Sequence, residues 1–180
     1  MKNKIANTLM KLMKTYPYED ITVSMLCKEV PVSRPTFYNN FLNKDDVVMW
    51  FIQNDFMKNS FPIFKFHLNE RGVQTFFSYI KNNKNFYLQL YHYDDGKLLF
   101  HSLTKAYIHS LDFKEEFSKK VKKESYRIDP VVFQKYSSSA IATIIVYWIQ
   151  NNMTIPEEKI SKDLYIMIEN SLGNVRDYYL

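Results

Sequence analysis

Apolar residues recur at intervals of three and four along most of the chain, the spacing that places them on one face of an α-helix. Near the N-terminus, Ile5, Leu9 and Leu12 follow this spacing with lysines between them, so the first helix is predicted to be amphipathic. The same pattern continues, with short interruptions, towards the C-terminus. It predicts an all-α protein.

The next three predicted helices begin with the same local signal, a side chain that can cap a helix N-terminus: Thr22, Ser33 and Asn43. Each cap follows an apolar residue, and another apolar residue stands at the fourth helical position, so each pair can form a hydrophobic staple. The pairs are Ile21 with Leu26, Val32 with Phe37, and Leu42 with Val47. Helices are therefore predicted at Val23–Glu29, at residues 34–41 and from Lys44 onward.

The helix from Lys44 is predicted to be long, ending near residue 60, and Gly72 is expected to separate it from the next helix. Asp129-Pro130 has the order expected at a helix start, because proline suits the first helical turn. The later helices are predicted at residues 73–81, 86–93, 98–110, 113–124, 130–152 and from 156 onward. We therefore expect a three-helix head at residues 1–47, joined by the long helix to a helical body at residues 48–180.

Composition narrows the class of function. Three glycines are too few for a many-turned β protein or for a glycine-rich phosphate loop. A net charge of +5 suits a polyanionic partner, but the lysine-rich and asparagine-rich composition of an AT-rich genome explains it equally well. Cys27 is the only cysteine, so no internal disulfide can form, and no apolar run is long enough to cross a bilayer. We expect a cytoplasmic protein.

The residues that most often carry catalysis or bind metals show no productive spacing. His101 and His109 are eight positions apart, whereas a helical metal-ligand pair needs three or four. Cys27 stands in the middle of a predicted helix and is expected to be a small core residue. No order of Ser, His and Asp indicates a hydrolase. We expect no enzyme activity, no cofactor and no metal.

Two short helices joined by residues 30–33 are typical of a helix-turn-helix, whose second helix enters the major groove of DNA. Phe37 and Phe41, four positions apart, are expected to face the inside of the head. The side chains left facing outward are Arg34, Pro35, Tyr38 and Asn39. Arginine can bond guanine, asparagine can bond adenine, and proline or tyrosine can touch a thymine methyl. These four are the candidate base contacts, although Arg34 could be an ordinary surface arginine and Tyr38 could pack half-buried.

This segment resembles the DNA-binding signature of the TetR family. The matching residues are Thr22-Val23, Val32-Ser33, Thr36-Phe37-Tyr38, Phe41 and Lys44-Asp45, within a match that covers about residues 5–50. The resemblance implies base contacts from Arg34, Pro35, Tyr38 and Asn39, and phosphate contacts from Thr22, Thr36, Asn40 and Lys44. Asn40 stands where histidine or tyrosine is commoner. Pro31 stands where the family usually has glycine, so the turn is expected to differ, because proline holds φ near −65°.

The last two predicted helices are the expected dimer interface, because a single helix-turn-helix reads few bases and such proteins usually bind palindromes as symmetric dimers. The candidate interface residues are Ala140, Ile141, Ile144, Tyr147, Trp148, Ile160, Leu164 and Ile168. Burial of this helix within its own chain is the alternative. Tyr147-Trp148-Ile149 and the residues around it resemble the TetR branch that includes dihydroxyacetone-kinase operon activators.

TetR-like bodies usually hold a small-molecule effector, and this resemblance implies a pocket beside the long helix. Many aromatic residues could line one or could simply form the core: Phe56, Phe64, Phe66, Phe76, Phe77, Tyr79, Phe86, Tyr87, Tyr91, Tyr93, Phe100 and Tyr107. A protein co-regulator docked on the body is the alternative to a small molecule. The expected partners are therefore a double-stranded DNA operator, a second copy of the chain, and one of these two effectors, with no membrane partner.

Overall fold

The computed structural model describes residues 1–59, 70–110 and 129–177, and every regular element within these ranges is a helix. This confirms the all-α prediction. Among the same residues, no helix combines the length and apolar character needed to cross a membrane. The predicted helix at residues 113–124 lies outside the described ranges.

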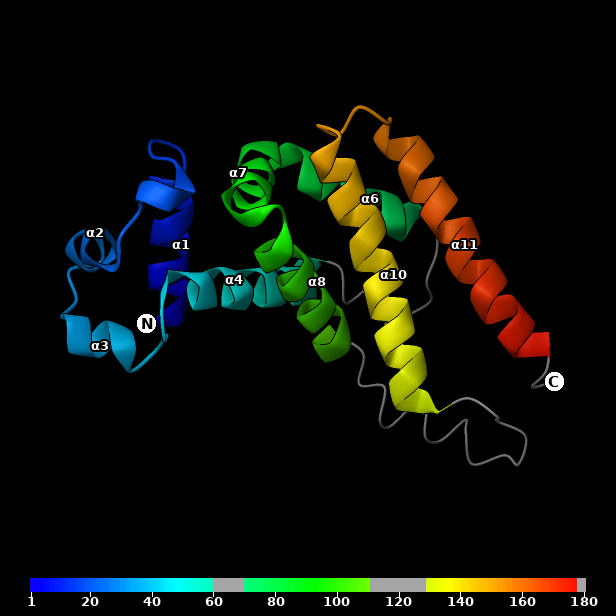
Figure 1. Ribbon diagram of the computed structural model, residues 1–180, viewed down its shortest axis with the longest axis horizontal. Helices are drawn as coiled ribbons and strands as arrows, with labels where there is room; N and C mark the ends of the chain where they lie inside the picture. The colour runs from blue at the N-terminus through cyan, green and yellow to red at the C-terminus, as the bar shows by residue number, and fades with distance from the viewer. Residues whose placement is uncertain (60–69, 111–128, 178–180) are drawn as a thin grey trace.

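The head lies at one end of the molecule and consists of four short elements (Figure 1). They are α1 (Lys2–Leu12), a 3₁₀ turn η1 (Tyr18–Asp20), α2 (Val23–Glu29) and α3 (Arg34–Tyr38). Ile5, Leu9 and Leu26 are fully buried between them. The head therefore has its own small core, with α2 and α3 on its outer side.

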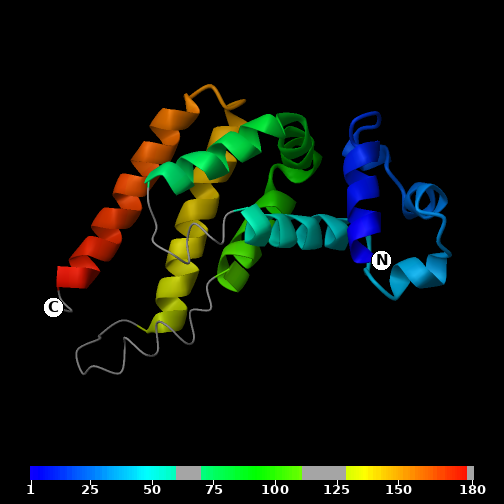
Figure 2. The same cartoon turned by 180° about the vertical axis from the view of Figure 1, so that it is seen from behind.

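The long helix α4 (Lys44–Asn59) leads from the head into the body and crosses α8 (Lys97–Ser110), against which it packs (Figure 1). The other body helices are α6 (Glu70–Asn82), α7 (Lys84–Asp94), α10 (Pro130–Gln150) and α11 (Glu157–Asp177). Seen from behind, α6 lies beside α11, while α10 and α11 diverge from their shared turn (Figure 2). Helix α10 begins at Pro130, as Asp129-Pro130 predicts, and the Asp129 side chain caps it.

The capping side chains predicted in the head are confirmed. The backbone N–H of Met25 donates to Thr22 Oγ1 at 3.2 Å, and that of Thr36 donates to Ser33 Oγ at 3.2 Å. The N–H of Asp46 donates to Asn43 Oδ1 at 2.8 Å. Each cap satisfies a donor that a helix start would otherwise leave unpaired.

Three local predictions are wrong. Helix α3 ends at Tyr38 rather than at Phe41. Gly72 lies inside the first turn of α6 rather than between helices. Leu42 is 80% exposed and so cannot staple the buried Val47; the Asp46 carboxylate instead accepts the N–H of Leu42 at 3.1 Å. A polar bond takes the place of the predicted apolar contact at the start of α4.

The body is held together around Trp148, which is fully buried. Its ring lies edge-on to Phe77 of α6, with centroids 5.1 Å apart, and its indole N–H donates to the Ile155 carbonyl at 2.8 Å. Glu157 at the start of α11 pairs with Lys81 at 3.0 Å and accepts a bond from Ser78. These contacts tie α6, α10 and α11 together at one end of the body.

Pro31 occupies the turn between α2 and α3 with φ of 25°. The sequence-based expectation that proline would prevent a positive φ here is therefore wrong. The turn keeps the bond that closes such helix ends, because the Val32 N–H donates to the Cys27 carbonyl at 3.0 Å. The pyrrolidine ring favours φ near −65° and has no N–H, so this turn is strained and lacks the second bond that glycine would supply.

Replacing Pro31 with glycine should stabilise the head. Relief of backbone strain contributes roughly 1–3 kcal/mol, and the greater freedom of glycine in the unfolded chain costs up to about 1 kcal/mol. We expect a net gain of about 1 kcal/mol in the free energy of unfolding, measured by urea titration.

Pro17→Gly is the matched control, because Pro17 has φ of −55°, which proline favours. It should lower the free energy of unfolding by roughly 0.5–1 kcal/mol. Equal destabilisation by the two substitutions would show that the turn at Pro31 is not strained.

Candidate nucleic-acid interface

The outer face of α3 presents all four predicted base-contact residues to solvent: Arg34, Pro35, Tyr38 and Asn39. On the opposite side, Phe37 and Phe41 are 0% and 2% exposed, as predicted. Tyr38 is 53% exposed, and its ring also packs edge-on against Phe37, with centroids 5.4 Å apart. The phenylalanines therefore fix which side of α3 faces outward.

Arg34 does not project freely into solvent. Its guanidinium donates a short hydrogen bond to Ser24 Oγ in the first turn of α2. Since a guanidinium has five N–H donors, this bond orients the group and leaves others for a base edge. The contact between Ser24 and Arg34 was not predicted, because no local pattern links position 24 with position 34.

Of the predicted phosphate contacts, Thr22 and Thr36 lie at the starts of α2 and α3, and Asn40 follows the end of α3. Thr22 is exposed, and its hydroxyl oxygen caps α2. The Thr36 and Ser33 hydroxyls lie 2.8 Å apart, and the Asn40 amide donates to the Thr36 carbonyl at 2.8 Å. A capping hydroxyl still has a hydrogen to donate, so these bonds are compatible with phosphate contacts.

Lys44, the fourth predicted phosphate contact, lies half-buried at the start of α4. Its ammonium donates to the backbone carbonyls of Tyr18 and Glu19 at 2.7 and 3.0 Å. Burial lowers the pKa of the Lys44 amine from its ordinary value, while the nearby carboxylates of Asp45, Asp20 and Glu19 act in the opposite direction. The side chain therefore serves the head's own structure in addition to any contact with DNA.

The predicted dimer residues differ in exposure within the single chain and fall into three groups. Ala140 and Tyr147 are exposed on α10, where they share one stripe with Tyr136 and Thr143, and Ile144 and Ile168 are half-buried. The others are buried by their own chain: Ile141, Trp148, Ile160 and Leu164. The prediction is wrong for Trp148, which is fully enclosed and has no surface to offer a partner. Because α10 is apolar on almost all sides, its sequence does not indicate which face packs against its own core.

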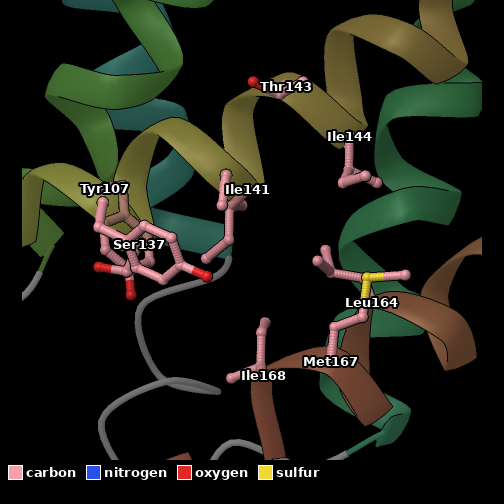
Figure 3. Close-up of a pocket in the computed structure, with 10 residues that line it drawn as sticks. Tyr107, Ser137, Ile141, Thr143, Ile144, Leu164, Met167 and Ile168 are labelled. Carbon is pink, nitrogen blue, oxygen red and sulfur yellow. The ribbon is translucent and has the colours of Figure 1, made fainter. Parts of the chain in front are cut away.

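An apolar groove of about 400 Å³ lies between α10 and α11 and reaches Tyr107 of α8. Ile141 and Ile144 point from α10 towards Leu164, Met167 and Ile168 of α11 (Figure 3). At the inner end, the Tyr107 hydroxyl is hydrogen-bonded to Ser137, and burial raises the pKa of Tyr107. We call this feature the α10–α11 groove.

The groove uses few of the aromatic residues singled out in the sequence. Tyr107 lines it, whereas Phe76, Phe77, Phe86 and Tyr87 are buried in the core. The side chains of Phe56, Phe64 and Phe66 lie outside the described residues. The helical spacing of aromatic residues thus indicated mainly core positions. Tyr136, which lines the groove, was not among the aromatic residues predicted to line a pocket.

Comparison with known proteins identifies the family. Residues 70–170, more than half of the chain, match the TetR family model described as a transcriptional regulator C-terminal region. The chain belongs to the TetR-type transcriptional regulators. Transcription regulation through a helix-turn-helix head follows from this membership and agrees with the arrangement of α2 and α3.

One curated protein and one solved structure are also similar to this chain. The chain is 27% identical over 127 residues to the HTH-type dhaKLM operon transcriptional activator DhaS of Lactococcus lactis subsp. lactis (strain IL1403), covering 63% of this chain and 68% of that protein. The solved structure of dihydroxyacetone kinase operon activator DhaS superposes with a TM-score of 0.58 at 21% identity. That superposition covers 97% of this chain and 96% of that one, so this TetR-type regulator shares its fold over nearly the whole length.

Proposed function

We propose that this regulator binds a palindromic DNA operator as a homodimer, with α3 of each copy in the major groove. The observation that supports the proposal is the two-sided character of α3. Its phenylalanines are buried behind it, while Arg34, Pro35, Tyr38 and Asn39 form a continuous outer face. A helix with this exposed set offers donors for base edges and apolar groups for thymine methyls.

Phosphate contacts would set the register of α3 on the duplex, since such contacts position a protein while base contacts specify the sequence. Thr22 and Thr36 stand near the starts of α2 and α3, where helix dipoles favour anions. Lys44 would add a charge at the start of α4. Among the described residues, two carbonyls accept from its ammonium, which leaves a third donor for a phosphate.

Selection of bound sequences from random duplexes is the experiment that tests the proposal. We expect an enriched palindrome with two half-sites spaced by about one turn of DNA, roughly 10 base pairs. Enrichment of no sequence above background would contradict specific DNA binding. Enrichment of an asymmetric single site would contradict the dimer.

Arg34→Ala and Lys44→Ala should affect the selected site differently. Loss of a base contact should cost roughly 1–3 kcal/mol at the operator and relax the preference at one base position. Loss of a phosphate contact should weaken binding to all sequences alike and reduce the slope of log K against log salt by about 1. Titrations at several salt concentrations measure both effects. An equal loss on operator and random DNA for Arg34→Ala would refute its base-reading role.

We also propose that the exposed stripe of α10, together with α11, forms the dimer interface. Tyr136, Ala140, Thr143 and Tyr147 lie at helical spacing on one exposed face, with small side chains between two tyrosines. Ile166 and Met167 extend the apolar surface on α11. Small residues at the centre allow two helices to approach closely, and the tyrosines supply area at either side.

Ala140→Glu should break this dimer, because it would place a carboxylate without a partner at the centre of the interface. We expect the dimer dissociation constant to rise by on the order of 100-fold, in line with the roughly 3 kcal/mol cost of an uncompensated buried charge. Sedimentation velocity measures the change. Thr154→Glu, an exposed small residue in the turn after α10, is the control and should leave the dimer intact. A dimer that survives Ala140→Glu would place the interface elsewhere.

We further propose that the inner end of the α10–α11 groove holds a small apolar or aromatic effector. The volume of the whole groove falls in the range of small-molecule sites, and the walls of the groove are mainly aliphatic. Tyr107 at the inner end belongs to α8, and α8 packs against α4. A ligand that displaces α8 would therefore move the helix that carries the head.

A thermal-shift screen of small apolar and aromatic compounds tests this effector site. Compounds that occupy the groove should raise the melting temperature, and Ile141→Trp, which fills the groove, should abolish the rise. A rise that persists in Ile141→Trp would place the ligand elsewhere. Because the groove is half-open, a side chain from a protein co-regulator is the alternative occupant. That alternative predicts no shift with any compound, and a stable complex with a co-regulator that Ile141→Trp weakens.

A further inference from the structure

The head is attached to the body at a second place besides α4. Helix α7 approaches the C-terminal end of α1, where the side-chain amides of Gln89 and Asn85 donate to the Met13 carbonyl at 2.8 and 3.3 Å. One turn further along, α7 reaches η1 of the head. The contact joins residues more than seventy positions apart in sequence.

Tyr18 of η1 is the head's side of this contact. Its side chain is 1% exposed, and its ring lies edge-on to that of Tyr93 on α7, with centroids 4.8 Å apart. Its hydroxyl donates to Asp45 Oδ1 in the first turn of α4 at 2.5 Å. Burial, followed by this bond to Asp45, raises the pKa of Tyr18 far above its ordinary value, so the phenol stays neutral and remains a donor.

The Lys44 ammonium lies at the centre of these groups. It lies 4.4 Å from the centroid of the Tyr18 ring and 5.3 Å from that of Tyr93, in addition to its two carbonyl bonds. We call this set the Lys44 seat: the carbonyls of Tyr18 and Glu19 and the rings of Tyr18 and Tyr93. Of these groups, only the Tyr93 ring belongs to the body.

We propose that Tyr93 is a positioning residue for DNA binding, which acts by holding the Lys44 ammonium in its seat. The inference rests on the proposed DNA-binding function and names a body residue that contributes to it. A cation is attracted to the face of an aromatic ring, and more strongly where water is partly excluded, as at this half-buried lysine. Without the Tyr93 ring, the Lys44 ammonium loses one of its two aromatic contacts and can leave the position from which it would contact a phosphate.

The geometry distinguishes this role from ordinary core packing. Tyr93 is 36% exposed, so its ring contributes less apolar burial than the enclosed residues of α7, such as Leu90. Its close partners in the head are Tyr18 and Lys44, both beside the start of α4. A body residue that contacts this point can shift the orientation of the head without touching DNA.

The test compares Tyr93→Leu with Tyr93→Phe in the full-length protein, using the duplex selected from random sequences. Leucine keeps apolar bulk and removes the ring, so operator affinity should fall by about 3- to 10-fold, and the slope of log K against log salt should flatten towards that of Lys44→Met. Phenylalanine keeps the ring and should stay within about twofold of the wild type. His92→Leu, an aromatic-to-leucine change at the exposed neighbouring position, is the matched control and should have no effect.

A double-mutant cycle shows whether Tyr93 acts through Lys44. In a Lys44→Met background, Tyr93→Leu should cause no further loss of affinity, because the cation that the ring holds is gone. Losses that add in full, or a Tyr93→Leu protein with unchanged affinity and salt slope, would overturn the inference. A melting temperature for each variant separates loss of fold from loss of the seat. If the wild type itself selects no duplex, the proposed function fails first, and this inference fails with it.

Discussion

A five-residue helix has no stability of its own, and the regulator depends on how α3 is held. A helix this short forms too few internal hydrogen bonds to offset the free-energy cost of helix nucleation, so tertiary contacts must supply the remaining stabilisation. Here the Ser33 cap satisfies one end, and Phe37 is buried against the head. These two contacts turn a short segment into a rigid surface with one side facing outward.

The orientation of that surface is set by two attachments to the body. Helix α4 is the covalent one, and its start is built from polar bonds of Asn43 and Asp46 instead of an apolar staple. The second attachment is α7, through Gln89 and the pair of Tyr93 and Tyr18. Because these contacts are directional and largely polar or aromatic, a small change in the body can alter them without unfolding either part.

The body is tightly packed at the end where α10 and α11 are joined and less tightly packed at the opposite end. Trp148 and Glu157 tie α6, α10 and α11 together near the turn that joins the last two helices. Away from that turn, α10 and α11 diverge and leave the apolar groove with Tyr107 at its inner end. An apolar face left open in this way is the usual mark of a surface that another molecule covers. Tyr136, Ala140 and Thr143 belong both to the exposed α10 stripe and to the lining of the groove, so the proposed dimer contact and the proposed effector site share residues.

The helical class, the three caps in the head and the outward face of α3 can all be predicted from the amino-acid sequence. Those features depend on residues within about four positions of one another, so a local pattern encodes them. The packing of the helices, by contrast, leaves Leu42 exposed, encloses Trp148 within its own chain and places Pro31 at a positive φ. It also brought Ser24 to Arg34 and Tyr93 to Lys44. Such contacts join distant positions, and their energies depend on how whole helices pack, which no short stretch of sequence records.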